Sequence, residues 1–366
     1  MLSYSIRNEF ADGQSVEFVP TAVQPLGLNE LATLARQPDA SITIQWLADD
    51  PKINGDMVPG IARMSHRITF NEAMAIYALV PNGGWLPVPF VSPACFLLDR
   101  NVVANFRKLR LNQNFRDQDA LRLWTAFFDQ GAGVFNPLPY AFEGSLRRVQ
   151  TFEEFVREFE RGVQEIEDTF PRCTIVRYSA TQYRAAFEQF VAIHAKTPLE
   201  MAFLCEISPV LTEPTSDAKL RTAVEQILAT ADRFNVARQS LAVLLALSSL
   251  YEDPRFGSSI GRQILKPKHT YGPPNAYNAI SDLRHIELAA LGHAWATNAQ
   301  FALCTCDRAI ASLWCALAIR DVIETATGPE FTIDYSSDLF PRLTDVAALS
   351  EIASLLSSDC VPKSHP

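Results

Sequence analysis

Two aspartates stand at the ends of short apolar segments that are far apart in the chain. Asp99 follows residues 94–98, Ala-Cys-Phe-Leu-Leu, and Asp307 follows residues 301–306, Phe-Ala-Leu-Cys-Thr-Cys. Short apolar runs of this kind are typical of strands buried in a parallel sheet. Because open α/β sheets bind ligands outside the carboxyl ends of their strands, we expect both aspartates to face one crevice.

Two further acids are candidates for the same site. Asp282 lies in an amphipathic helical pattern that leads to the second strand, and Glu143 ends the segment after the first long helical pattern. Clustered carboxylates repel one another unless cations neutralise them, and oxygen ligands suit Mg²⁺ or Mn²⁺. Two such ions about 4 Å apart can activate a water and stabilise the leaving oxygen in phosphodiester cleavage.

The segments around these acids resemble the motifs of PIN-domain nucleases. Residues 96–102, Phe-Leu-Leu-Asp-Arg-Asn-Val, are similar to the family's opening motif of a hydrophobic strand, Asp, any residue, Asn and Val. Residues 304–309, Cys-Thr-Cys-Asp-Arg-Ala, resemble its late Thr/Ser-x-Asp motif, and residues 278–287 look like the helix that supplies the third acid. Glu143 lies 44 residues after Asp99, and Asp307 lies 25 residues after Asp282. Both intervals are similar to those of the family.

The resemblance covers about residues 94–150 and 270–335. It implies an α/β, PIN-like three-layer fold with a central parallel sheet, and metal-dependent cleavage of RNA, typically single-stranded. It also implies a catalytic set that binds Mg²⁺ or Mn²⁺ through Asp99, Glu143, Asp282 and Asp307. On the same resemblance, Asn101 and Thr305 support the site by hydrogen bonds.

The chain departs from compact, toxin-type PIN proteins in its size and spacing. Glu143 and Asp282 are 139 residues apart, which implies a helical insertion at about residues 151–260. We therefore predict a PIN-like domain over 93–335, a small α+β region of unknown role over 1–92, and a C-terminal helix and tail over 336–366.

Hydrophobic periodicity and turn residues predict the elements that position the acids. Besides the two strands above, we expect strands at 41–47, 172–178 and 331–334. We expect helices at 71–79, 101–130, from a Thr151/Glu154 capping box to about 168, 181–251, 276–293, after Asp307 through Leu317, and at 342–357. The Pro- and Gly-rich residues 81–93 favour a linker.

Each acid also has a purely structural interpretation. Asp99 and Asp307 stand where helices are expected to begin, and Asp is a common helix cap. Glu143 has Glu200 and Glu206 as rivals, and residues 140–144 are equally compatible with a helix end followed by Gly144.

Five arginines lie near the acids in the sequence, and two interpretations of them stay open. The first is that they position substrate phosphates. The second is that they face solvent or pair with the acids. They are Arg100, Arg147, Arg148, Arg284 and Arg308, and all but Arg148 are our candidates for phosphate binding.

Composition limits the remaining choices. The 366 residues carry a formal net charge of −9, which excludes a broad basic face for nucleic acid. If four of these carboxylates hold two divalent ions, the charge becomes −9 + 4, or about −5, so a small metal-dependent contact with RNA is still compatible. The longest uncharged run, 73–98, is interrupted by Pro and Gly, so we expect no membrane span. We also expect no signal peptide, and the seven scattered cysteines favour a reduced, cytoplasmic protein.

Other functions are compatible with the same residues. One is a catalytically inactive PIN-like binding or scaffold module that uses the helical insertion as its partner surface. Another is a flap- or structure-specific DNA nuclease. A phosphatase with an Asp nucleophile usually has a second Asp two residues later, where this chain has Asn101. A regulatory protein partner and the oligomeric state stay open.

Overall fold

The computed structural model describes residues 5–9, 13–37, 39–69, 76–81, 83–91, 94–113, 128, 133–252, 258–295, 300–325, 328–343 and 345–357. The chain divides into two compact units. The first comprises Met1–Tyr140, Phe159–Arg177 and Trp295–Ala311, and the second Ala141–Glu158, Tyr178–Ala294 and Ser312–Pro366. The chain passes between the units within four helices: α4 (Leu138–Glu143), α5 (Phe152–Thr169), α11 (Pro273–Trp295) and α12 (Arg308–Ala316).

The N-terminal part of the first unit contains two small antiparallel sheets and helix α1 (Leu28–Arg36). One sheet has the order β1 (Ile6–Glu9), β2 (Ser15–Phe18), β5 (Lys52–Ile53) and β6 (Asp56–Met57). The other has the order β3 (Pro20–Val23), β4 (Ser41–Asp49) and β7 (Ile61–Thr69). Strand β4 confirms the strand predicted at 41–47, and its buried residues alternate with more exposed ones.

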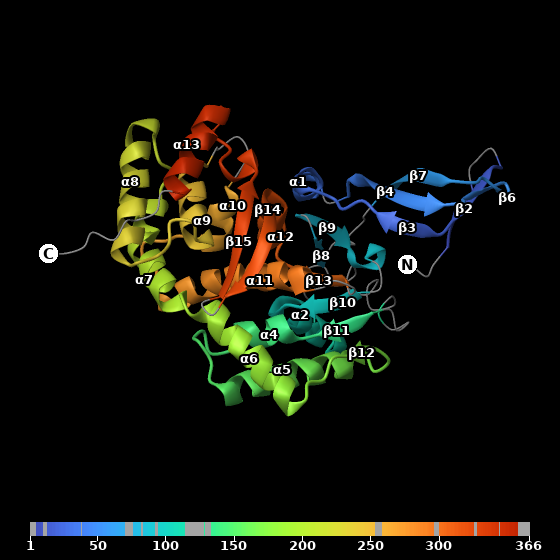
Figure 1. Cartoon of the computed structure of the whole chain (residues 1–366), viewed down its shortest axis with the longest axis horizontal. Helices are drawn as coiled ribbons and strands as arrows, with labels where there is room; N and C mark the ends of the chain where they lie inside the picture. The colour runs from blue at the N-terminus through green and yellow to red at the C-terminus, as the bar shows by residue number, and fades with distance from the viewer. Residues whose placement is uncertain are drawn as a thin grey trace. The chain divides into compact units, whose positions relative to one another are not determined.

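A mixed six-stranded sheet forms the centre of the first unit. Its order is β12 (Thr174–Ile175), β11 (Val134–Asn136), β10 (Ala94–Leu98), β13 (Gln300–Thr305), β8 (Tyr77–Val80) and β9 (Gly84–Pro87) (Figure 1). The four strands from β12 to β13 are parallel to one another, which confirms the predicted strands at 94–98 and 301–306 and a short strand within 172–178. Strands β8 and β9 are antiparallel to their neighbours.

The prediction for residues 71–93 was wrong where the structure describes them. Residues 77–79 belong to a strand, β8, and residues 71–75 lie outside the described part. The expected linker contains β9 and the 3₁₀ helix η1 (Val88–Phe90), and Trp85 of β9 is fully buried against Tyr77. All four residues of β8 are buried, so the strand has no alternation that would distinguish it from a buried helix. The sheet therefore extends across the boundary predicted at residue 92.

Aromatic side chains fill the core against this sheet. Phe96 and Phe135 of the central strands pack with Phe106, Phe128 and Phe170, at ring-centroid distances between 4.7 and 6.1 Å. Helix α2 (Arg100–Arg110) contributes Phe106, and it ends well before the predicted end at residue 130. Residues 114–127, 129 and 130 of that prediction lie outside the described part. This core holds α2 in place, and α2 is the helix that begins directly after Asp99.

The second unit is mainly helical. Its helices are α6 (Ala180–His194), α7 (Thr197–Ile207), α8 (Asp217–Arg233), α9 (Leu241–Leu250), α10 (Ile260–Leu265) and α13 (Val346–Ser357), with 3₁₀ helices η2 (Ser208–Leu211) and η3 (Ser337–Leu339). The helical pattern predicted over 181–251 is thus confirmed, as four separate α-helices. Every residue of α9 is buried. The capping box predicted before α5 is present, with Thr151 and Glu154 each bonded to the other's backbone N–H.

An antiparallel hairpin completes the second unit. It joins β14 (Leu317–Thr325) to β15 (Gly328–Tyr335), and β15 confirms the strand predicted at 331–334. Leu317 was predicted to lie on a helix, but α12 ends at Ala316 and Leu317 begins β14. Among the described residues, no helix combines the length and the hydropathy that crossing a membrane requires.

Candidate functional site

The strand ends that carry Asp99 and Asp307 are neighbours in the central sheet. Leu98 of β10 lies opposite Cys304 of β13, and the Asp99 backbone N–H donates a 3.2 Å hydrogen bond to the Cys304 carbonyl. The chain runs from β10 to β11 and β12 on one side, then returns as β13 on the other side of β10. The strand order therefore reverses between β10 and β13, and open α/β sheets bind ligands at such a point.

Asp99 is buried, with 1% of its surface exposed, although it carries an ionisable group. Its Oδ1 atom accepts a 2.7 Å hydrogen bond from the Val102 N–H and caps α2. Its Oδ2 atom is also buried and accepts no hydrogen bond of normal geometry from a described residue. Burial raises the pKa of Asp99 to about 7 and outweighs the opposing effect of nearby hydrogen-bond donors. The Asp99 carboxyl group therefore lies where neither water nor a positive charge fully offsets the cost of ionising it.

Thr305 and Asp307 form a tight turn beside Asp99. Thr305 is fully buried, and its Oγ1 atom accepts a 3.0 Å hydrogen bond from the Asp307 N–H. The Thr305 hydroxyl also lowers the pKa of Asp99, whereas the negative charge of Asp307 raises it. Asp307 itself is only partly buried, and its Oδ1 atom accepts a 2.7 Å bond from the Ala309 N–H. The structure therefore brings together Asp99, Thr305 and Asp307 from the set proposed from the sequence.

Both aspartates accept hydrogen bonds at the starts of helices, as the helix-cap interpretation predicted. Asp99 caps α2, and Asp307 makes the equivalent local bond at the start of α12. Each of these capping bonds uses Oδ1, which leaves the Oδ2 atom of each carboxylate outside the cap. Capping and ligand binding are therefore compatible at both positions.

No described lysine or arginine forms an ion pair with Asp99 or Asp307. The Arg100 guanidinium lies over the Tyr140 ring, 4.6 Å from its centroid. Arg308 is exposed, and Asn101 is exposed while its backbone N–H lowers the pKa of Asp99. The two acids thus form a negative site without an internal cation.

The other two predicted acids belong to the second unit. Glu143 is the last residue of α4, and Gly144 follows it at φ +62°, which matches the helix-end interpretation of this segment. The Glu143 carbonyl accepts a 3.2 Å hydrogen bond from the Tyr277 hydroxyl. Asp282 is partly buried on α11.

Two of the predicted phosphate-binding arginines lie in the second unit as well. Arg147 is exposed and adopts φ +52°. Arg284 is buried and pairs with Glu200 and Glu287. Because these acids occupy its guanidinium group, the pairing weighs against the phosphate-binding role predicted for Arg284.

The Asp99–Asp307 pair provides the donor atoms that a hard divalent cation prefers. Within the described residues, no group of three or more His, Cys, Asp and Glu side chains is arranged to hold a metal ion. Mg²⁺ is commonly held by one or two carboxylates together with waters and substrate phosphates. An orphaned, buried carboxylate oxygen beside a second carboxylate fits that type of site.

Comparisons with known proteins do not decide among the candidate functions. No protein-family model, curated protein or solved structure matches the chain. The functional argument therefore depends on the chemistry of the site itself.

The sequence did not indicate a second polar centre, which surrounds Arg284. Glu200 entered the sequence argument only as a rival of Glu143, and Glu287 did not enter it. The i, i+3 spacing of Arg284 and Glu287 on one helix was the available local signal.

Proposed function

We propose that the chain is a PIN-like, Mg²⁺- or Mn²⁺-dependent endoribonuclease whose metal site includes Asp99 and Asp307. The observation that carries the proposal is the buried Asp99 carboxylate, which pairs with no described lysine or arginine and whose Oδ2 atom accepts no hydrogen bond of normal geometry from a described residue. Its position at the reversal of the strand order supports a ligand site at this edge of the sheet. The sequence resemblance gives that ligand site its reaction.

The residues around the pair have separable roles in this proposal. A bound Mg²⁺ or Mn²⁺ supplies Lewis acidity and lowers the pKa of a water. Asp99 and Asp307 hold the ion, and the backbone bonds to their Oδ1 atoms fix the orientation of both carboxylates. Thr305 keeps Asp307 in place through its hydroxyl. Arg100 directly follows Asp99 in the sequence, and Arg308 directly follows Asp307. One or both of these arginines contact the substrate phosphates.

The sequence resemblance adds Glu143 and Asp282 as further metal ligands, and Asn101 as a supporting residue. Their assignment rests on the motifs and on the chain intervals alone. Single Glu143→Gln and Asp282→Asn variants test each assignment separately, since a ligand that binds the reacting metal cannot be replaced without loss of cleavage.

A second candidate function is an inactive PIN-like binding module. It is favoured by the capping bonds, because both aspartates already have a structural role at the helix starts. In such a module the acids would stabilise the fold without binding metal. The two candidates therefore differ in a measurable property, metal-dependent cleavage.

Cleavage of a labelled single-stranded RNA with Mn²⁺ tests the proposal. We expect Asp99→Asn and Asp307→Asn each to reduce the rate by about 100-fold or more. Asp345→Asn is the matched control, because Asp345 also bonds the N–H two residues later, at 3.0 Å, at the start of α13. Unchanged cleavage in both site variants would contradict the assignment. A DNA oligonucleotide of the same sequence distinguishes an RNA-specific enzyme from a DNA nuclease.

A further inference from the structure

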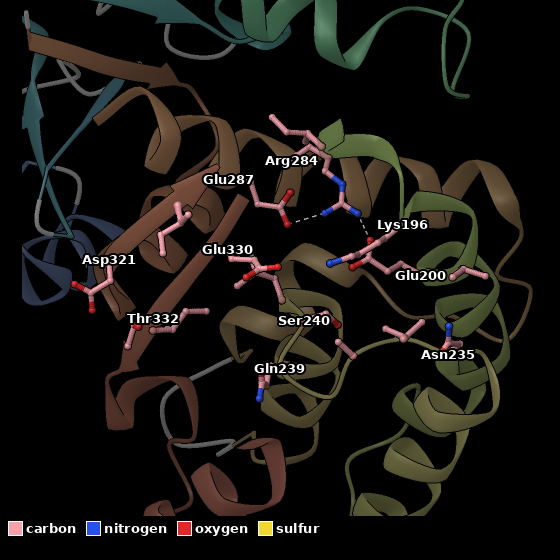
Figure 2. Close-up of a pocket in the computed structure, with 17 residues that line it drawn as sticks. Lys196, Glu200, Asn235, Gln239, Ser240, Arg284, Glu287, Asp321, Glu330 and Thr332 are labelled. Atoms are coloured by element: carbon pink, nitrogen blue, oxygen red, sulfur yellow. Dashed lines mark hydrogen bonds and ion pairs between the residues drawn. The ribbon is translucent and has the colours of Figure 1, made fainter. Parts of the chain in front are cut away.

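A cavity of about 700 Å³ lies within the second unit (Figure 2). Its walls come from the start of α7, the segment 235–241, α11 and the β14–β15 hairpin. This volume is within the usual range of small-molecule sites. None of its lining residues belongs to the pair Asp99 and Asp307, so the cavity and the proposed metal site are separate.

A buried group of three charged side chains forms one side of the cavity. Arg284, 3% exposed in its side chain, donates from Nη1 to Glu287 Oε1 at 2.7 Å and from Nη2 to Glu200 Oε2. Figure 2 shows the two carboxylates on either side of the guanidinium group. Arg284 also approaches the Thr197 hydroxyl through Nε, so each arm of the guanidinium group already has a partner.

Each of these two carboxylates keeps one oxygen without a partner. Glu200 is only 4% exposed, yet its Oε1 atom accepts no hydrogen bond from a described residue, and the same holds for Oε2 of Glu287. Both residues line an open cavity, so an oxygen without a partner in the protein is available to a ligand that donates N–H groups.

The charges around the cavity select the sign of the ligand. Four acids line it against two cations: Glu200, Glu287, Asp321 and Glu330 against Lys196 and Arg284. Arg284 pairs with Glu200 and Glu287, and the Lys196 charge also acts on Glu287, so the lining keeps two more acids than cations. Figure 2 shows Glu330 extending from β15 toward the Arg284 group. A cation would be attracted to this site and an anion repelled.

Two features support a built binding site rather than a packing defect. A β-bulge interrupts the β14–β15 ladder between Arg320 and Ile323, and Asp321 lies in it at φ +52°. Bulges often occur next to active sites, where they re-aim a side chain. In addition, burial raises the pKa of Glu287 to about 7 despite the opposing charge of Arg284. One arginine therefore does not fully compensate the buried acids.

The rest of the lining is partly polar, with Asn235, Gln239, Ser240 and Thr332, and partly aliphatic. Ile193, Val236 and Leu241 are buried, and Ile333 is partly buried. These side chains suit the hydrocarbon part of a ligand whose charged end contacts the acids. We infer that the cavity binds a small aliphatic primary amine, with its ammonium group at Glu200, Glu287 and Glu330 and its chain against these aliphatic side chains.

Calorimetric titration of the full chain at pH 8 tests the inference with four ligands of one chain length. The probes are 1-aminopentane, 1,5-diaminopentane, 1-pentanol and pentanoate. We expect saturable binding of both amines and no binding of the alcohol or the acid. Equal binding of 1-pentanol would show that the cavity selects only apolar chains, and preferential binding of pentanoate would show that its cations dominate. Either result, or no saturable amine binding in the millimolar range, overturns the inference.

A charge-neutral substitution at the cavity rim locates the binding. Glu330→Gln changes an exposed side chain, so the fold does not depend on it. We expect it to weaken amine binding about 10-fold, because one charge-assisted contact is lost. Glu225→Gln on α8, outside the cavity lining, is the matched control and should bind as the wild type does. Equal amine affinity in Glu330→Gln and wild type would contradict the location.

Discussion

Two buried carboxyl groups, one in each unit, respond to burial in the same way but are compensated differently. Burial raises the pKa of Asp99 in the first unit and that of Glu287 in the second to about 7. Glu287 is paired with the buried Arg284, which opposes the shift. Asp99 has no such partner among the described residues, and the negative charge of Asp307 increases the shift.

This difference separates an acid that has an internal cation from an acid that depends on an external one. A buried acid with an arginine can remain charged without any ligand, although the pair itself adds little net stability. A buried acid beside a second acid stays charged only when a cation arrives from solution. In the second unit Arg284 therefore ties the acid into the fold, whereas in our proposal the acid of the first unit binds metal.

The largest expected effect on stability comes from removing the internal cation. Arg284→Met leaves Glu200 and Glu287 buried without compensation, so we expect the free energy of unfolding to fall by about 3–5 kcal/mol. Urea denaturation measures this change. Arg148→Met, which breaks the exposed pair with Glu154, should have a far smaller effect. Equal losses in the two variants would remove the contrast between a buried pair and a surface pair.

A gain in stability is expected when the charge of Asp99 is removed. Asp99→Asn keeps a side chain that can cap α2 but removes the buried charge, so we expect a gain of about 1–3 kcal/mol at pH 8 with a chelator present. The folded-state pKa is raised to about 7 from 3.8, so the wild type loses stability as the pH rises through this window. The gain should therefore disappear near pH 4. Denaturation at the two pH values checks it, and a gain that does not depend on pH would contradict the origin in charge.

The smallest expected effect is on substrate binding beside Asp307. Arg308→Gln removes an exposed positive charge next to the proposed metal site, so we expect KM for RNA to rise about 3-fold with kcat unchanged. Steady-state cleavage measures both constants. Arg221→Gln, an exposed arginine on α8, serves as the control. If the two variants behave alike, the phosphate role of Arg308 is wrong.

The sequence predicted those parts of the fold whose signals are local. The apolar runs before Asp99 and Asp307 identified β10 and β13, and the Thr151/Glu154 capping box identified the start of α5. Adjacent parallel strands then bring the two aspartates to one edge of the sheet. The pairing of these acids was therefore predictable from strand type alone.

The errors arose where tertiary contacts decide the structure. The continuous apolar run of β8 suits a helix or a strand equally, and only its pairing with β13 and β9 makes it a strand. Arg284 lies 84 residues from Glu200 in the chain, so their contact has no sequence signal. In the sequence, Arg284 lies two residues after Asp282 on an expected amphipathic helix, and nothing in that pattern indicates that Arg284 is buried. The cavity in the second unit was missed for the same reason.

Mn²⁺ binding at the Asp99–Asp307 pair is the most direct test of the account. Calorimetric titration at pH 8 compares the wild type with Asp99→Asn, Asp307→Asn and the control Asp345→Asn. The account predicts saturable binding in the wild type and the control, and an affinity at least about 10-fold lower in each site variant. Equal affinity in all four proteins, or no binding by the wild type, would contradict a metal site at these aspartates.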